Sequence, residues 1–73
     1  MARLIRLDRT GHTTLAEWSA ADAEGRAAAE EAFRRELENG MLASATREGR
    51  AEVVRELPLD AELVVLRRPI AGG

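Results

Sequence analysis

The sequence predicts an α+β domain in which one helix packs across one face of a mixed sheet of about five strands. Three observations support this prediction. Residues 20–39 form a strongly helical segment, two short apolar runs precede it and three follow it, and turn-forming residues separate the runs. With 73 residues, the chain is long enough for one domain and too short for two.

The first two apolar runs predict a β-hairpin. Residues 3–8 and 12–18 are rich in β-branched and large apolar side chains, and a short segment that ends in Gly11 separates them. Glycine adopts the positive φ of a short hairpin loop without steric cost. Trp18 stands where the second run meets the helix, and we expect its ring to pack over the edge of the core.

The boundaries of the helix are predicted from its capping residues. Ser19 and Asp22 resemble a capping box in which Asp replaces the usual Glu, which predicts a helix from about residue 20. Gly25 weakens the first turns and favours a regular helix from nearer Arg26. Gly40 supplies the stop signal at the other end.

One apolar stripe is expected to face the sheet. Ala29, Phe33 and Leu37 recur every four residues, so they lie on the same side of a helix. Glu36 and Glu38 are expected on the opposite, solvated side, where paired carboxylates need no catalytic explanation.

Three further strands are predicted after the helix, at residues 41–46, 53–57 and 63–67. Residues 47–50 fit a hairpin turn between the first two, and residues 58–61 fit a tight connection before the last. Residues 63–66 of the last run are continuously apolar, which is typical of a central strand. A right-handed crossover would place this strand in the middle of the sheet, parallel to the first strand.

The composition argues against several classes of function. The chain has no cysteine and one histidine, His12, so we expect neither a metal site nor a thiol nucleophile, and His12 is interpreted as a solvated turn residue. Its 13 acidic and 11 basic residues are interspersed and give a net charge of −2, which disfavours nucleic-acid binding. No apolar run is long enough for a membrane span or a signal peptide. We therefore expect a cytoplasmic protein that is not an enzyme and needs no cofactor.

The carboxyl terminus carries the most specific signal. From the end of the last predicted strand the chain continues as a basic, proline-containing segment that closes on two glycines, Arg67-Arg68-Pro69-Ile70-Ala71-Gly72-Gly73. Together with the element order, this tail resembles the β-grasp, ubiquitin-like family. It looks most like the bacterial ubiquitin-like modifiers, whose tails often read Pro-x-x-Gly-Gly. The resemblance implies a β-grasp domain over residues 1–68 and an extended tail over residues 69–73.

The resemblance also implies a function for the tail. In this family the terminal carboxylate is adenylated by an E1-like activating enzyme, passes to a cysteine as a thioester, and is joined to an amine of a target protein, in some systems by an E2-like conjugating enzyme. Gly73 would then be the residue that is activated and conjugated, and Gly72 would leave room for the tail in a narrow enzyme channel. Contacts with the activating enzyme are implied for Arg67, Arg68, Pro69 and Ile70.

Two alternatives remain open on the sequence alone. The same fold and tail would suit a sulfur carrier, in which Gly73 becomes a thiocarboxylate, or a β-grasp interaction module whose tail is never activated. Arg67 and Arg68 can equally be read as a solvated strand end. Ala71 stands where ubiquitin carries an arginine, which argues against recognition by a eukaryotic activating enzyme.

Overall fold

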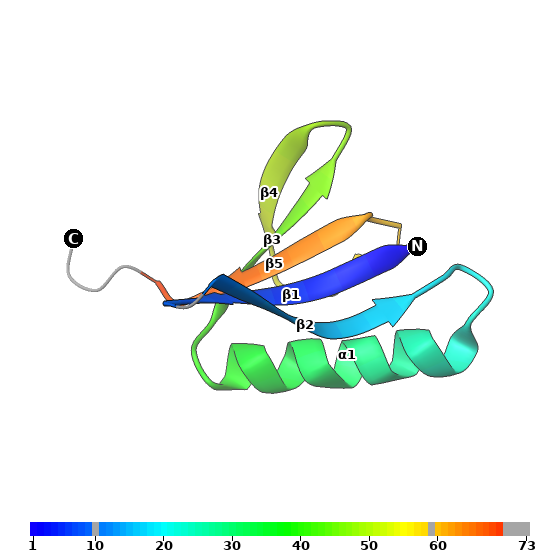
Figure 1. Ribbon diagram of the computed structural model, residues 1–73, viewed down its shortest axis with the longest axis horizontal. Coiled ribbons are helices and arrows are strands. Elements are labelled where there is room, and N and C mark those ends of the chain that lie inside the picture. Colours follow the sequence, from blue (N-terminus) through cyan, green and yellow to red (C-terminus); the bar gives the residue numbers. More distant parts are fainter. Residues whose placement is uncertain (10, 59, 70–73) are drawn as a thin grey trace.

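The computed structural model describes residues 1–9, 11–58 and 60–69. Its elements are one helix and five strands, in the order β1 (Ala2–Asp8), β2 (Gly11–Trp18), α1 (Ala23–Glu38), β3 (Leu42–Arg47), β4 (Arg50–Val54) and β5 (Leu63–Arg67). The sheet has the strand order β2-β1-β5-β3-β4, and α1 lies across one of its faces (Figure 1). This is a β-grasp-like α+β fold, as the sequence predicts.

The amino-terminal hairpin confirms the first prediction and adds an irregularity. Gly11 has a φ of 126°, in the region that glycine favours. The register of β1 and β2 shifts at one point, because Leu4 pairs with Ala16 while Ile5 pairs with Thr14. This leaves Leu15 as an extra residue on β2, as in a β-bulge. Both Leu15 and Ala16 consequently pack against the core cluster.

The helix begins later than the capping residues predicted. Its N-cap is Asp22, whose carboxylate accepts a hydrogen bond from the backbone N–H of Gly25 at 2.9 Å. Ser19 belongs to the turn before the helix, since its carbonyl accepts from the N–H of Asp22 at 3.0 Å. The expected start near Arg26 is also wrong, because Gly25 lies in the first turn. A Cβ at Gly25 would meet the Asp22 carboxylate, so the missing side chain makes the cap possible.

The end of α1 is a Schellman motif. The N–H of Met41 donates to the carbonyl of Glu36 and the N–H of Gly40 donates to the carbonyl of Leu37, each at 3.0 Å. Gly40 has a φ of 88°, which this motif requires. Met41 therefore belongs to the cap and β3 starts one residue later than predicted.

The β3–β4 hairpin corrects one strand boundary. Glu48 and Gly49 have φ values of 49° and 77°, the paired positive values of a tight two-residue turn. Pairing begins at once with Arg47 opposite Arg50. The strand therefore spans Arg50–Val54, whereas its apolar residues predicted residues 53–57. The geometry of the turn, and not the apolar run, determines where β4 begins.

The last strand occupies the predicted central position. β5 is parallel to β1 and antiparallel to β3, so both of its edges are hydrogen-bonded. A tight connection leads into it, in which the N–H of Ala61 donates to the carbonyl of Pro58 at 3.0 Å. The direction of β5 sends the chain out of the middle of the sheet at its carboxyl end (Figure 1).

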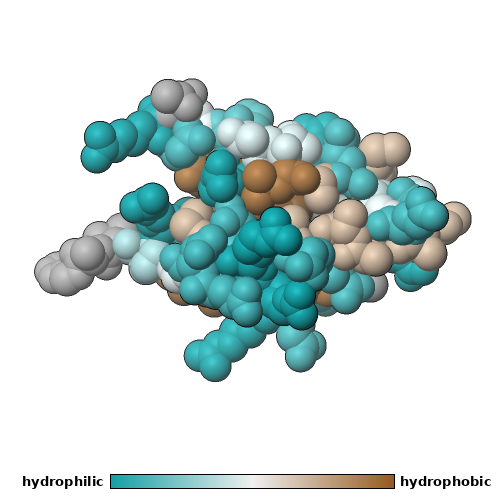
Figure 2. Space-filling model, turned by 90° about the horizontal axis from the view of Figure 1, so that it is seen from below, coloured by the Kyte–Doolittle hydropathy of each residue, from teal (hydrophilic) through white to brown (hydrophobic). Residues whose placement is uncertain are grey.

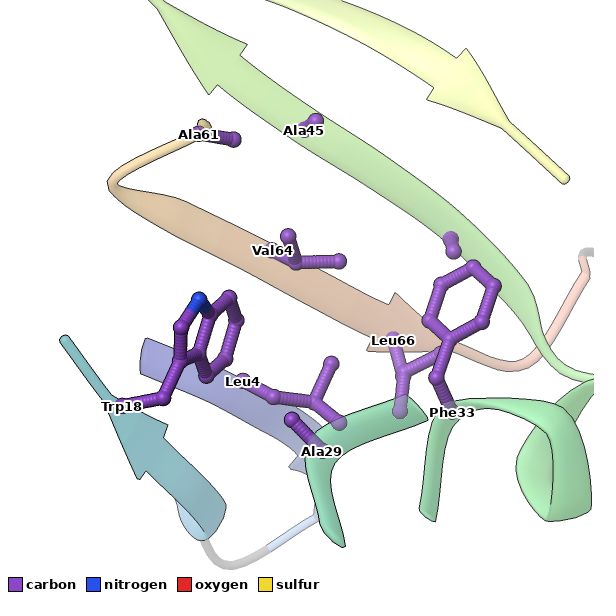
Figure 3. Packing of buried hydrophobic residues seen from close by; sticks show 9 residues of the cluster. Leu4, Trp18, Ala29, Phe33, Ala45, Ala61, Val64 and Leu66 are labelled. Carbon is purple, nitrogen blue, oxygen red and sulfur yellow. The ribbon is translucent and has the colours of Figure 1, made fainter. Parts of the chain in front are cut away.

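The core lies between α1 and the sheet (Figure 3). Phe33 reaches from the helix towards Leu66 of β5, while Trp18 packs at the opposite end beside Leu4 of β1. Trp18 is only 1% exposed, so it is a core residue rather than a cover at the core edge. Within the part of the chain that the structure describes, the buried hydrophobic residues are Leu4, Ile5, Trp18, Ala29, Phe33, Ala43, Ala45, Ala61, Val64 and Leu66. Four of these ten are alanine, so the core depends on a few large side chains.

The outward side of α1 is mostly hydrophilic, as Figure 2 shows from the helix side of the molecule. Within the described part of the chain, no helix has the length and apolar character needed to cross a membrane.

Candidate functional site

The tail leaves the sheet at the end of β5. Arg67 is the last residue of the strand, and Arg68 and Pro69, which follow without regular secondary structure, are exposed like Arg67 itself. Ile70, Gly72 and Gly73 lie outside the described residues. The structure therefore describes the base of the predicted conjugation site, and the division into a domain of residues 1–68 and a tail of residues 69–73 stays a prediction.

Only one of the two arginines before the tail lines a cleft. Arg67 lies opposite Leu42 in the β3–β5 register, and successive side chains of a strand point to opposite faces. Arg68 lines a cleft to which Arg67 does not contribute. In the sequence Arg67 and Arg68 form one basic pair, whereas in the structure only Arg68 lines this cleft.

This cleft has a volume of about 1270 Å³ and lies where β1, the end of α1 and the base of the tail meet. In Figure 2 this end of the molecule is hollowed, at the left of the view. The residues that line it are Arg6, Leu7, Asp8, Arg9, Glu36, Asn39, Gly40, Met41, Arg68 and Pro69. We call it the tail-base cleft.

A part-buried ion pair forms one wall of the tail-base cleft. Arg6 of β1 donates from its guanidinium to the Glu36 carboxylate of α1 across 2.9 Å. Glu36 is buried, at 9% exposure, so the expected solvated position for this residue is wrong. Glu38 is exposed, as predicted. A carboxylate can be buried here because its charge meets a hydrogen-bonding partner.

The sequence contained a signal for Glu36. Ala29, Phe33 and Glu36 follow the i, i+4, i+7 spacing of a single helix face, and these three residues are the buried ones in α1. Leu37, chosen for the stripe on hydropathy, is half-buried beside them. Arg6 shares the inward alternation of β1 with Leu4, so a basic residue faces the helix at this level. A basic residue on the side of β1 that faces the helix, together with an acidic residue on the side of α1 that faces the sheet, predicts this ion pair.

His12 is exposed on β2. Across residues 1–9, 11–58 and 60–69, no three His, Asp or Glu side chains gather where they could hold a metal ion.

Comparison of the chain with models of known protein families, with curated proteins and with solved structures gave no match.

Proposed function

We propose that this chain is a ubiquitin-like protein modifier, activated at the Gly73 carboxylate by an adenylating enzyme and joined to amines of target proteins. The observation that carries this function is the combination of a β-grasp-like fold with a tail that follows its central strand and closes on Gly72 and Gly73. A fold by itself hosts many functions, so the tail provides the specific part.

Activation and conjugation of Gly73 would take three substitution steps. The Gly73 carboxylate attacks the α-phosphorus of ATP and releases pyrophosphate, which leaves an acyl-adenylate. A cysteine thiolate of the activating enzyme attacks the acyl carbon and releases AMP. A target amine then attacks the thioester, forms the amide and releases the thiol, while its proton passes to a base. The chain supplies only the acyl group, so it needs no catalytic residue of its own.

The exposed base of the tail suits this role. Arg67, Arg68 and Pro69 are all exposed, so an enzyme can contact them without unfolding the sheet. Guanidinium groups bind carboxylates with two parallel hydrogen bonds, and we assign Arg67 and Arg68 to acidic groups of the activating enzyme. Pro69 and Ile70 would contribute apolar contacts beside them.

The intact mass of the protein recovered from its host tests this function. A modifier is expected both as a free chain with a carboxylate at Gly73 and as higher-mass conjugates in which Gly73 forms an amide with a target residue. A variant without Gly73, expressed at the same level, is the control and should yield no conjugates. Replacement of one oxygen by sulfur at the terminus would instead identify a sulfur carrier. A chain found only unconjugated, with its tail unaltered, would identify an interaction module.

A further inference from the structure

The tail-base cleft carries an excess of positive charge that the fold does not use. Among the described residues, three arginines and two carboxylates line it, although the chain as a whole has a net charge of −2. Glu36 is neutralised by Arg6 at 2.9 Å, and Asp8 has an interaction of its own within the chain. Within the described residues, Arg9 and Arg68 have no ion-pair partner, and both are exposed.

Apolar surface lies between these cations. Leu7 is 43% exposed at the end of β1, Met41 is half-buried after the Schellman motif, and Pro69 is exposed at the base of the tail. All three side chains line the same cleft as Arg9 and Arg68. Arginine and methionine are both enriched in protein interfaces, and side by side they can contact a ligand that has both anionic and apolar groups.

The walls of the cleft are held by rigid contacts. The Arg6–Glu36 ion pair joins β1 to α1, and the hydrogen bond from Met41 to the Glu36 carbonyl fixes the segment that follows the helix. Glu36 therefore anchors two walls, one through its side chain and the other through its backbone. These two contacts are already formed without a ligand, so the ordering that binding requires falls on exposed side chains such as Arg9 and Arg68.

We propose that the tail-base cleft is a docking site for an acidic segment of a partner protein, in which carboxylate side chains alternate with apolar ones. The carboxylates would pair with Arg9 and Arg68, and the apolar side chains would cover Leu7 and Met41. At about 1270 Å³ the cleft is larger than the roughly 300–1000 Å³ of an ordinary small-molecule pocket, and it accommodates a stretch of polypeptide. Binding at this site requires no activation of Gly73, although Arg68 and Pro69 are also the residues proposed to contact the activating enzyme.

Titration of the isotope-labelled chain with a short capped peptide of alternating glutamate and leucine, followed by NMR, tests this site. We expect saturable shifts of the backbone signals of Leu7, Arg9 and Met41. A peptide with glutamine in place of glutamate should bind roughly tenfold more weakly, because two surface ion pairs are lost. The Arg9→Glu/Arg68→Glu variant should lose binding to the glutamate peptide by at least the same factor.

The control variant is Arg50→Glu/Arg55→Glu, which makes the same change in net charge. Arg50 is the first residue of the edge strand β4 and Arg55 follows its last residue, so this variant should bind the peptide like the unaltered chain. The spectra of both variants report whether they are folded. Equal loss of binding in both variants would show a general charge effect and overturn the assignment. Shifts elsewhere on the molecule would do the same. Inorganic phosphate producing the same shifts at equal concentration would identify a plain anion site instead.

Discussion

Gly25 is the residue on which the start of α1 depends. The Asp22 carboxylate accepts its N–H at 2.9 Å, and a Cβ at this position would meet that carboxylate. Gly25→Ala therefore combines two opposed effects. Alanine in a helix is favoured over glycine by about 1 kcal/mol, while loss of an N-cap costs about 0.5–2 kcal/mol.

We expect these two effects to separate in a double-mutant cycle. Gly25→Ala alone should change the free energy of unfolding by between a gain of about 0.5 kcal/mol and a loss of about 1 kcal/mol, because the loss of the cap offsets part or all of the gain in helix propensity. In the background of Asp22→Ala, where the cap is already absent, the same change should stabilise the protein by about 1 kcal/mol. Urea unfolding measures both values. Equal gains in the two backgrounds would show that Gly25 and Asp22 do not interact.

Arg6 and Glu36 act as a unit. Arg6→Leu leaves the buried Glu36 carboxylate without its hydrogen-bonding partner, and should cost about 1–2 kcal/mol, moderated because the arginine side chain is 41% exposed. Adding Glu36→Leu should recover most of that loss, since two apolar side chains can replace a buried pair. Urea unfolding of the two single variants and the double variant gives the coupling energy. Additive costs would contradict the pairing.

Phe33 joins α1 to the sheet. It is the only phenylalanine of the chain, is 3% exposed, and reaches towards Leu66 of β5 (Figure 3). Truncation of a buried phenylalanine to alanine costs about 3–5 kcal/mol, which is comparable to the stability of a domain of this size. We expect Phe33→Ala to be largely unfolded at room temperature by circular dichroism.

Leu37→Ala is the matched control for this change. Leu37 lies one turn further along the same helix but is only half-buried, so its truncation should leave a cooperative thermal transition. A Phe33→Ala protein that melts within a few degrees of the unaltered chain would show that the helix does not depend on this ring.

The β3–β4 turn holds a residue that is poorly suited to it. Glu48 has a φ of 49°, which asparagine and glycine tolerate better than glutamate. Glu48→Asn should raise the free energy of unfolding by about 0.5–1 kcal/mol, whereas Gly49→Ala, at a φ of 77°, should lower it by about 1 kcal/mol or more. Chemical unfolding checks both. A destabilising Glu48→Asn would contradict the turn geometry.

At the scale of the whole molecule, the sequence predicted element order and topology better than it predicted boundaries. Hydropathy patterns identify the helix and the strands, and turn residues identify the hairpins. The continuous apolar run and the right-handed crossover then predicted the central position of β5. The start of β4 was not, because a two-residue turn at Glu48 and Gly49 determines it. Glu36 was missed because hydropathy alone assigns a carboxylate to solvent, while its partner Arg6 lies 30 residues away in sequence.

The candidate site, too, was predictable only in part from the sequence. Its chemistry was predicted from the tail, in which Gly72 and Gly73 follow a basic segment. The tail-base cleft could not be predicted, because its walls come from β1, the end of α1 and the segment after β5. Such a surface exists only once the sheet has formed with β5 beside β1.

Activation at Gly73 is the central claim, and ATP–pyrophosphate exchange measures its first step directly. With the adenylating enzyme of the same host, the full chain should support exchange. Deletion of Gly73, or Gly72→Leu, should abolish exchange while circular dichroism shows an unaltered fold. Ala51→Leu is the matched small-to-large control on the exposed edge strand β4, and should exchange like the unaltered chain. Exchange by the chain without Gly73 at the rate of the full chain would contradict the claim.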